Sequence, residues 1–231
     1  MKKLDYLYCI SIAGCILVAC QSPKSPDAVT TAPKEEAEVS DGRKYTVNNT
    51  ESTVEWIGTK VSGYHSGTVM IKSGELTVSN GTVTSGNFVM DMPSIIATGP
   101  DKVKPEANAK LTGHLHSADF FDVNNFPEAT FTITGVKPFS GELKETDDPR
   151  QEKLSKYRVT NPTHTVSGNL TIKGIDKNIE FPARITISDA SVEAQAKFNI
   201  DRKLWGISYT GAPDDLIRDE IHLGIFLKAM K

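Results

Sequence analysis

Cysteine is scarce in this chain, and its position excludes several kinds of chemistry. The three cysteines, Cys9, Cys15 and Cys20, all lie within the first 20 of 231 residues. Cleavage before Cys20 would remove two of them and acylate the third. No thiol would then remain for a disulfide, a catalytic nucleophile or a thiolate metal site.

The sequence also lacks a basic patch and the common catalytic motifs. Its formal net charge is −3, with no cluster of Lys and Arg. It therefore has no electrostatic footprint for nucleic acid and no basis for tight binding to anionic lipid head groups. There is no Gly-X-Ser-X-Gly elbow, no phosphate-cradling glycine loop and no dinucleotide motif. We expect no nucleic-acid partner, no catalytic residue and no cofactor.

The first residues have the features of a lipoprotein signal peptide. A cationic start precedes an apolar stretch, Tyr6 to Ala19, that is too short at ~1.5 Å per residue to span a bilayer comfortably. The stretch ends in Leu-Val-Ala-Cys, the pattern of a lipobox. We expect a signal peptide over residues 1–19 and acylation of Cys20, with palmitate among the chains. The alternatives are an ordinary secretory peptide and a lipobox at Cys15, which would leave a short apolar core interrupted by Asp5.

Residues 20–43 have the composition of a linker. They are rich in Ser, Pro, Thr, Ala and Glu without apolar periodicity, so they cannot bury enough surface to fold alone. The expected organisation is a lipidated flexible tether over 20–43 and one domain over 44–231. Two or more acyl chains would hold the protein firmly at a membrane. We expect it in the bacterial cell envelope, lipid-anchored at the outer membrane, on its periplasmic or surface face.

Apolar residues alternate with polar ones through most of the domain. Such alternation indicates strands with one buried and one wet face, typical of antiparallel sheet, and the frequent turn signals predict an all-β barrel or sandwich. Asn80-Gly81 is a strong hairpin signal. Two segments break the pattern: residues 101–111, expected to be a short helix or helical turn, and residues 142–156, expected to be an exposed insertion.

Three stretches resemble one family of bacterial envelope proteins, the YceI-like family of lipocalin-like isoprenoid-binding barrels. Gly113 to Phe131 combines a His-X-His-Ser start, a paired phenylalanine and a Phe-Pro turn ahead of an alternating strand. Gly168 to Pro182 agrees with the family, as does Phe198 to Ser208 followed by Arg218 to Leu227. The resemblance runs from about Tyr45 to the C-terminus.

The resemblance implies a barrel of about eight strands that holds an isoprenoid-type lipid, with a polyprenyl or quinone tail. It also makes a homodimer a candidate assembly. Inward-facing positions of such a barrel would form the binding site. The expected ligand-binding residues are Phe88, Leu115, Phe120, Phe131, Ile133, Leu170, Ile172, Ile185, Phe198 and Trp205.

Clusters of polar residues indicate a metal or catalytic site only weakly, compared with the motifs that indicate a lipid-binding barrel. His114 and His116 would point to the same face if they lay on a strand, with Asp119 nearby, but no third zinc ligand has a defined spacing. We therefore expect no metal site, and we expect His114 to bond within the barrel mouth and His116 to be solvated. The acidic pairs 147–148, 214–215 and 219–220 lie in polar, turn-like contexts, where solvated side chains are more common than a catalytic acid and base.

Two aromatic motifs have structural and functional interpretations. Phe120, Phe121 and Phe126 would form either a gate at one end of the barrel or a plug of the core. Trp205 belongs to an Arg-X-X-aromatic-Gly-Ile element that the resemblance identifies, and it is expected to shape one end of the cavity. Arg202 is expected to bond loop carbonyls or a carboxylate.

The resulting hypothesis is a non-enzymatic lipid-binding or lipid-transporting lipoprotein. A barrel filled by its own side chains, acting as an interaction or stress-protection module at the envelope, is the main alternative. A hydrolase with a metal held by histidines is the least favoured.

We predict that Cys20→Ser blocks acylation and leaves a soluble or uncleaved precursor, because a hydroxyl does not replace the acceptor thiol of a lipobox. Metabolic labelling with a radioactive fatty acid checks this. Labelling that persists in the variant would place the anchor at Cys15 or elsewhere.

Overall fold

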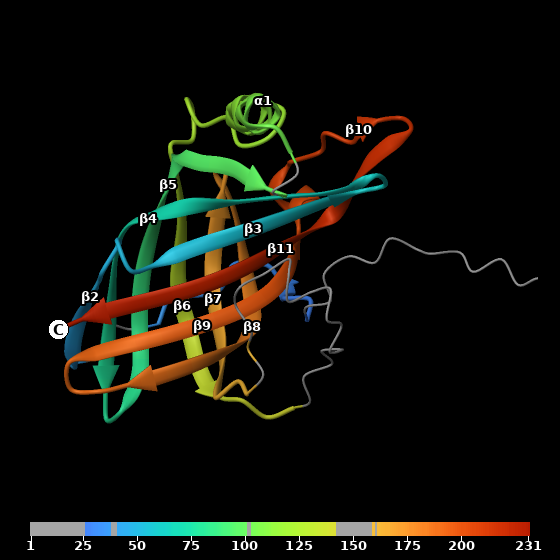
Figure 1. Cartoon of the computed structure of the whole chain (residues 1–231). Coiled ribbons are helices and arrows are strands. Elements are labelled where there is room, and N and C mark those ends of the chain that lie inside the picture. Colours follow the sequence, from blue (N-terminus) through green and yellow to red (C-terminus); the bar gives the residue numbers. More distant parts are fainter. Residues whose placement is uncertain (1–25, 38–40, 101–102, 142–158, 160) are drawn as a thin grey trace, which may run out of the picture.

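Eight strands form a closed antiparallel barrel in the computed structural model, which describes residues 26–37, 41–100, 103–141, 159 and 161–231 (Figure 1). Successive neighbours around the wall are β3, β4, β5, β6, β7, β8, β9, β11 and again β3. This confirms the predicted lipocalin-like barrel over a sandwich. The elements are β1 (Val29–Thr31), β2 (Arg43–Val47), β3 (Thr53–Lys60), β4 (Gly63–Ser79), β5 (Thr82–Gly99), α1 (Pro105–His116), β6 (Glu128–Pro138), β7 (His164–Ile172), β8 (Ile175–Ile187), β9 (Ser191–Asp201), η1 (Arg202–Trp205), β10 (Gly211–Ala212) and β11 (Asp215–Met230).

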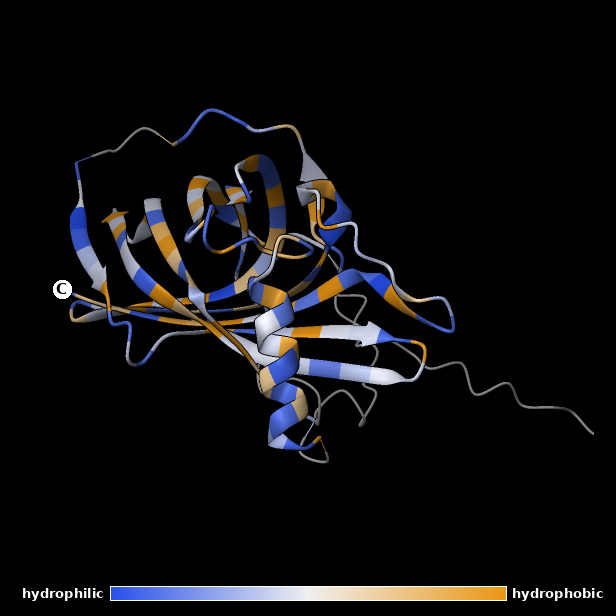
Figure 2. Ribbon diagram, turned by 90° about the horizontal axis from the view of Figure 1, so that it is seen from above, coloured by the Kyte–Doolittle hydropathy of each residue, from blue (hydrophilic) through white to orange (hydrophobic). Residues whose placement is uncertain are grey.

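The alternation predicted from the sequence sets the two faces of the wall. Orange and blue bands follow one another along the strands in Figure 2. On β7, for example, Val166 and Leu170 face the interior and are buried, whereas Ser167 and Asn169 lie on the outer face. The predicted turn at Asn80-Gly81 joins β4 to β5, and both residues have positive φ, 51° and 76°. That conformation matches the twist of the flanking strands.

The two ends of the barrel carry different connections. The β3–β4 and β7–β8 turns, the α1 segment and the stretch from η1 to β10 lie at one end, here called the mouth end. The β4–β5 and β8–β9 turns and the C-terminus lie at the other, called the closed end (Figure 1). None of the helices in the described part of the chain is long and apolar enough to cross a bilayer.

The described part of the predicted tether is built into the barrel wall. Strands β8 and β9 pair with each other only over residues 183–187 and 192–196. Beyond that point β8 pairs with β1, while the backbone of Asn199 on β9 bonds Pro26 and Ala28. Residues 26–31 therefore lie between two diverging strands and satisfy their main-chain groups. A segment without its own apolar pattern is ordered here because pairing uses the backbone.

The segment then crosses the outside of the barrel. The amide of Lys34 donates to the Asn169 Oδ1 at 3.0 Å, and the Asn169 Nδ2 donates to the Lys34 carbonyl at 2.7 Å. Asn178, which is fully buried, links Asn169 to Thr134 through its side-chain amide. This polar ladder on the outer face docks residues 34–37, so a flexible tether is the wrong description for residues 26–37. The signal peptide, Cys20 and the insertion over 142–156 lie outside the described residues.

Helix α1 confirms the expected helical segment but ends later than predicted. It begins with Pro105 in its first turn, a favoured position because proline lacks the amide that is unpaired there anyway. It continues five residues past Leu111 to His116. The motif Gly113 to His116 is thus helical, whereas the zinc hypothesis required a strand.

We predict that Gly67→Ala destabilises the barrel, because strands β4 and β5 approach closely there. A Cβ at this position would overlap the Ile96 carbonyl oxygen and lie 2.7 Å from the Trp56 ring. Overpacking of this kind costs about 1–3 kcal/mol. Gly63→Ala is the matched control, since a Cβ there meets nothing within 4 Å. Denaturant unfolding should show a large loss for the first variant only, and equal effects would contradict the close approach.

Candidate functional site

A cavity of about 480 Å³ occupies the barrel interior. This volume lies within the range of ~300–1,000 Å³ that is usual for small-molecule sites. All eight barrel strands contribute to its wall through their inward positions. Representative wall residues are Val54, Val69, Met90, Phe131, Leu170, Phe181, Phe198 and Leu223.

The interior is hollow because several inward positions carry small residues. Gly58, Ala183, Ala194 and Ala196 all line the cavity and leave space that larger side chains would fill. Inward side chains within strands, such as Phe131 and Leu223, also keep accessible surface, as expected for groups that face an empty space. A barrel filled by its own side chains is therefore not what the structure shows.

The structure brings all of the sequence-predicted ligand-binding residues to this one cavity. Their contact with a ligand remains a prediction. The residues on the wall are Phe88, Leu115, Phe120, Phe131, Ile133, Leu170, Ile172, Ile185, Phe198 and Trp205.

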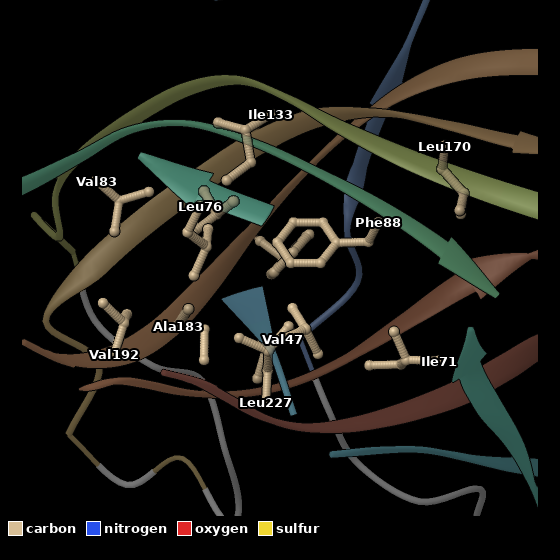
Figure 3. Close-up of a cluster of buried hydrophobic side chains, with 14 of the residues drawn as sticks. Val47, Ile71, Leu76, Val83, Phe88, Ile133, Leu170, Ala183, Val192 and Leu227 are labelled. Carbon is tan, nitrogen blue, oxygen red and sulfur yellow. The ribbon is translucent and has the colours of Figure 1, made fainter. Parts of the chain in front are cut away.

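The closed end of the cavity is apolar and sealed. Val192 is fully buried there, and Val83 and Ala183 are almost so. Figure 3 shows these side chains together with Leu76 and Leu227, which converge on the interior from different strands. No polar side chain of the described residues lines this end of the cavity, so it would accept only an apolar group.

The mouth end of the cavity carries charged and polar side chains. Lys60 and Asp215 form an ion pair and remain partly exposed, and Ser62 donates its amide and its hydroxyl to Asp215, each at 2.9 Å. The hydrogen bond from Lys60, with the Ser62 amide, lowers the pKa of Asp215 to about 2. His65 lines the cavity beside this pair, and burial followed by the charge of Lys60 lowers its pKa. The mouth therefore presents a compensated ion pair and a neutral imidazole near pH 7.

The two histidines of α1 do not form a shared site. The His114 Nε2 lies 3.0 Å from the Asp119 carboxylate, whereas the His116 Nε2 lies 3.0 Å from the Ile95 carbonyl oxygen. Two residues apart on a helix, their side chains point in different directions. The expectation that His116 is solvated was wrong, because it bonds to β5. Within the described residues no group of three potential ligands could hold a metal ion.

One acid of each described candidate pair has a structural partner. Asp215 pairs with Lys60, and Asp219 pairs with Arg202 and Lys203. The pair at 147–148 lies outside the described residues. None of the described carboxylates named here is presented to the cavity as a free acid or base.

The phenylalanine cluster is divided between two roles. Phe120 and Phe121 line the cavity at the mouth end, where Phe120 packs against His114 and Tyr209 with ring centroids 4.9 and 5.4 Å away. Phe126 instead lies beside Gly174 in the β7–β8 turn. The pair thus forms part of the cavity wall under α1, and the third ring packs on a neighbouring turn.

Comparison with known proteins agrees with this architecture. The model of the YceI-like domain matches residues 45–229. The chain belongs to the YceI-like family. "Protein YceI" of Salmonella arizonae and of Salmonella newport are each 32% identical over 78 residues, which cover 34% of this chain and 30% of theirs.

Two solved structures share the fold of this YceI-like chain at low sequence identity. Burkholderia cenocepacia BcnA superposes with a TM-score of 0.57 at 16% identity, over 80% of this chain and 99% of that one. A polyisoprenoid-binding domain from Saccharophagus degradans, implicated in plant cell wall breakdown, gives 0.56 at 13% identity, over 80% and 97%.

The late Arg-X-X-aromatic-Gly-Ile motif closes one side of this YceI-like barrel. Arg202 is almost fully buried and donates to the carbonyls of Arg218 and Ile207 and to the Asp219 carboxylate, which confirms the predicted bonding. Trp205 has no exposed surface, and its indole Nε1 donates to the Leu170 carbonyl at 3.0 Å. The motif therefore fixes η1 against β7 and β11.

Sequence reasoning did not place Lys60, His65 and Asp215 together at the mouth, although it named the acidic pair 214–215. Lys60 continues the inward phase of Val54 and Trp56, and His65 pairs across the sheet with inward-facing Gly58. Extending the alternation by two steps along β3 would have found Lys60. Asp215 gave no such signal, because it follows a turn.

We predict that Trp205→Phe destabilises the domain by about 1–2 kcal/mol more than Trp56→Phe. The first variant removes the hydrogen bond to Leu170, whereas the Trp56 Nε1 is buried without a hydrogen-bond partner in the described part of the chain. Both variants make the same change in size at a wall residue. Thermal or denaturant unfolding measures the difference, and equal losses would show that the Trp205 bond contributes little.

Proposed function

We propose that this protein binds and carries an isoprenoid-type lipid, with a polyprenyl or quinone tail, at the bacterial envelope and without catalysing a reaction. The apolar cavity that opens at one end of the barrel carries this proposal. The shared fold with a polyisoprenoid-binding domain from Saccharophagus degradans supports the ligand class.

An unbranched or prenyl tail suits the cavity physically. Removing apolar surface from water is favourable by roughly 2.5 kcal/mol for each 100 Å². The closed end has no polar group to satisfy among its described residues, so a tail enters without leaving a buried donor or acceptor unpaired. A flexible chain also adapts to the shape of such a cavity better than a rigid ligand of the same volume.

The asymmetry of the cavity orients the ligand. Lys60, His65 and Asp215 lie at the mouth, and aliphatic side chains such as Val83 and Val192 lie at the closed end. The tail therefore points inward and the head group remains at the mouth. Because the ion pair is already compensated, a polar head group would be bound by hydrogen bonds rather than by net charge.

The location belongs to the same proposal. Acylation at Cys20 would hold the carrier at a membrane of the envelope, where its ligand is found, and the outer membrane is the expected site. The envelope interaction module and the metal hydrolase receive less support, since the barrel is hollow and the two histidines of α1 diverge.

Mass spectrometry of organic extracts from natively purified protein tests the proposal. We expect a prenyl lipid in a ratio near one per chain. Extracts without lipid, from protein whose cavity also fails to take up a fluorescent prenyl probe, would overturn it.

We predict that Ile172→Trp displaces the lipid while the fold survives, because the added ring takes space that the tail uses. Ile172 lines the cavity and is only partly buried. Thr171→Trp is the matched control, since Thr171 lies on the outer face of β7 and bonds Asp176. Lipid content and melting temperature are measured for both. Loss of ~1–3 kcal/mol from Ile172→Trp with unchanged lipid content would contradict a hollow interior.

A further inference from the structure

Exposed apolar side chains gather at the mouth end of the barrel. Of the nine large hydrophobic residues that are exposed in the described part of the chain, five lie in the connections of this end or at the strand ends that adjoin them. We call these five the mouth rim: Val61, Ile175, Leu204, Tyr209 and Leu216. Among the described residues only Met230 is comparable at the closed end. Exposed apolar groups that cluster in this way mark an interaction surface.

The mouth rim surrounds the opening of the cavity. Val61 is 62% exposed and Leu216 49%, and the Val61 amide donates to the Leu216 carbonyl at 3.2 Å, so the tips of two hairpins present adjacent apolar side chains. These hairpins project together in Figure 1. Tyr209 both lines the cavity and stands in the rim, and Ile175 lies against η1 on another side.

The start of the described chain lies near the same end. Pro26 accepts a hydrogen bond from the Asn199 amide, two residues before the mouth end of β9 at Asp201. Pro26 lies six positions after Cys20, the expected anchor, and a chain of that length spans at most ~20 Å. A lipid anchor at Cys20 would therefore hold the mouth end, rather than the closed end, close to the membrane.

Basic side chains near the rim do not outnumber acidic ones: residues 60–63, 173–177 and 201–220 contain six of each. Lys60 pairs with Asp215, and Lys203 pairs with Asp219 at 2.7 Å, whereas Lys173 donates to the Ala118 carbonyl. The rim thus lacks the excess of Lys and Arg that attracts anionic lipids. Its affinity for a membrane would come from burial of apolar area and would be insensitive to salt.

From these observations we propose that the mouth rim docks onto an electrically neutral lipid bilayer and opens the cavity directly to the acyl layer. The inference rests on the proposed function. A ligand with a long apolar tail crosses water unfavourably, so it passes more readily between the cavity and the acyl layer when the two are in contact. A second copy of this chain on the rim would instead close the exit from both cavities.

Photo-crosslinking tests the docking surface. The full-length chain is anchored in vesicles of phosphatidylcholine that contain a photoactivatable phosphatidylcholine, and crosslinked peptides are identified by mass spectrometry. We expect adducts at Val61 and between Leu204 and Leu216, unchanged in high salt. Adducts mainly at the closed-end turns, near Asn80 or Asp189, would overturn the proposal, as would a requirement for anionic lipid.

A pair of double variants separates docking from folding. Val61→Ser with Leu216→Ser should lower rim adducts and the rate of lipid transfer to acceptor vesicles by about tenfold, since two side chains lose their burial. Met70→Ser with Met230→Ser removes two other exposed apolar side chains away from the mouth and should change neither. Equal effects of the two pairs would overturn the proposal.

Lipid extraction in parallel distinguishes the two proposals. Rim variants that retain bound lipid but lose adducts support docking through the rim. Rim adducts in protein that never contains lipid would support docking and refute the carrier function. Lipid-loaded protein whose rim never forms an adduct with the photoactivatable lipid would refute docking and leave the carrier function intact.

Discussion

Closed antiparallel pairing forces every second residue into the barrel interior, and the cavity depends on this constraint. A slip of one residue on β7, for example, would exchange the inward Leu170 and Ile172 for the outward Asn169 and Thr171. The outer polar ladder around Asn178 opposes such a slip, because its amide bonds only in the observed register. The same alternation thus defines both the apolar interior and the polar surface that holds the N-terminal segment.

The barrel interior is hollow because of the size of its inward-facing side chains and not because of their hydropathy. Inward alanines such as Ala183 and Ala196, with Gly58 across the barrel, reduce the volume that the wall contributes to the middle. Atoms that face this space lack packing partners on one side, and a bound tail would supply them. Stability comes instead from the packed regions at the two ends, which include Val192 and Leu227 at one and Leu115 and Phe120 at the other.

The two ends of the barrel differ in the chemical groups that they can bind. The closed end is buried and aliphatic, whereas the mouth combines an ion pair, an imidazole, aromatic rings under α1 and an exposed apolar rim. The structural relatives share the fold at 16% and 13% identity. Their likeness therefore describes the wall, and the chemistry of the mouth has to be argued from this chain's own side chains.

The sequence by itself determined the strands and the direction of their side chains. The period-2 pattern was strong enough to place Phe131, Ile133 and Leu170 on the interior face, and Asn80-Gly81 identified its turn. The prediction from sequence failed at the end of the helix. Helix α1 continues to His116, because the local pattern did not show where it would end against β5.

Tertiary structure alone decided three other features. Residues 26–31 complete the wall through main-chain hydrogen bonds, which carry no side-chain signature. The interior is hollow because the radius of an eight-stranded barrel exceeds what its inward residues fill. Lys60 and Asp215 meet at the mouth although they lie 155 positions apart in the sequence. Alternation gives the face of each residue, and only the closed barrel brings distant faces together.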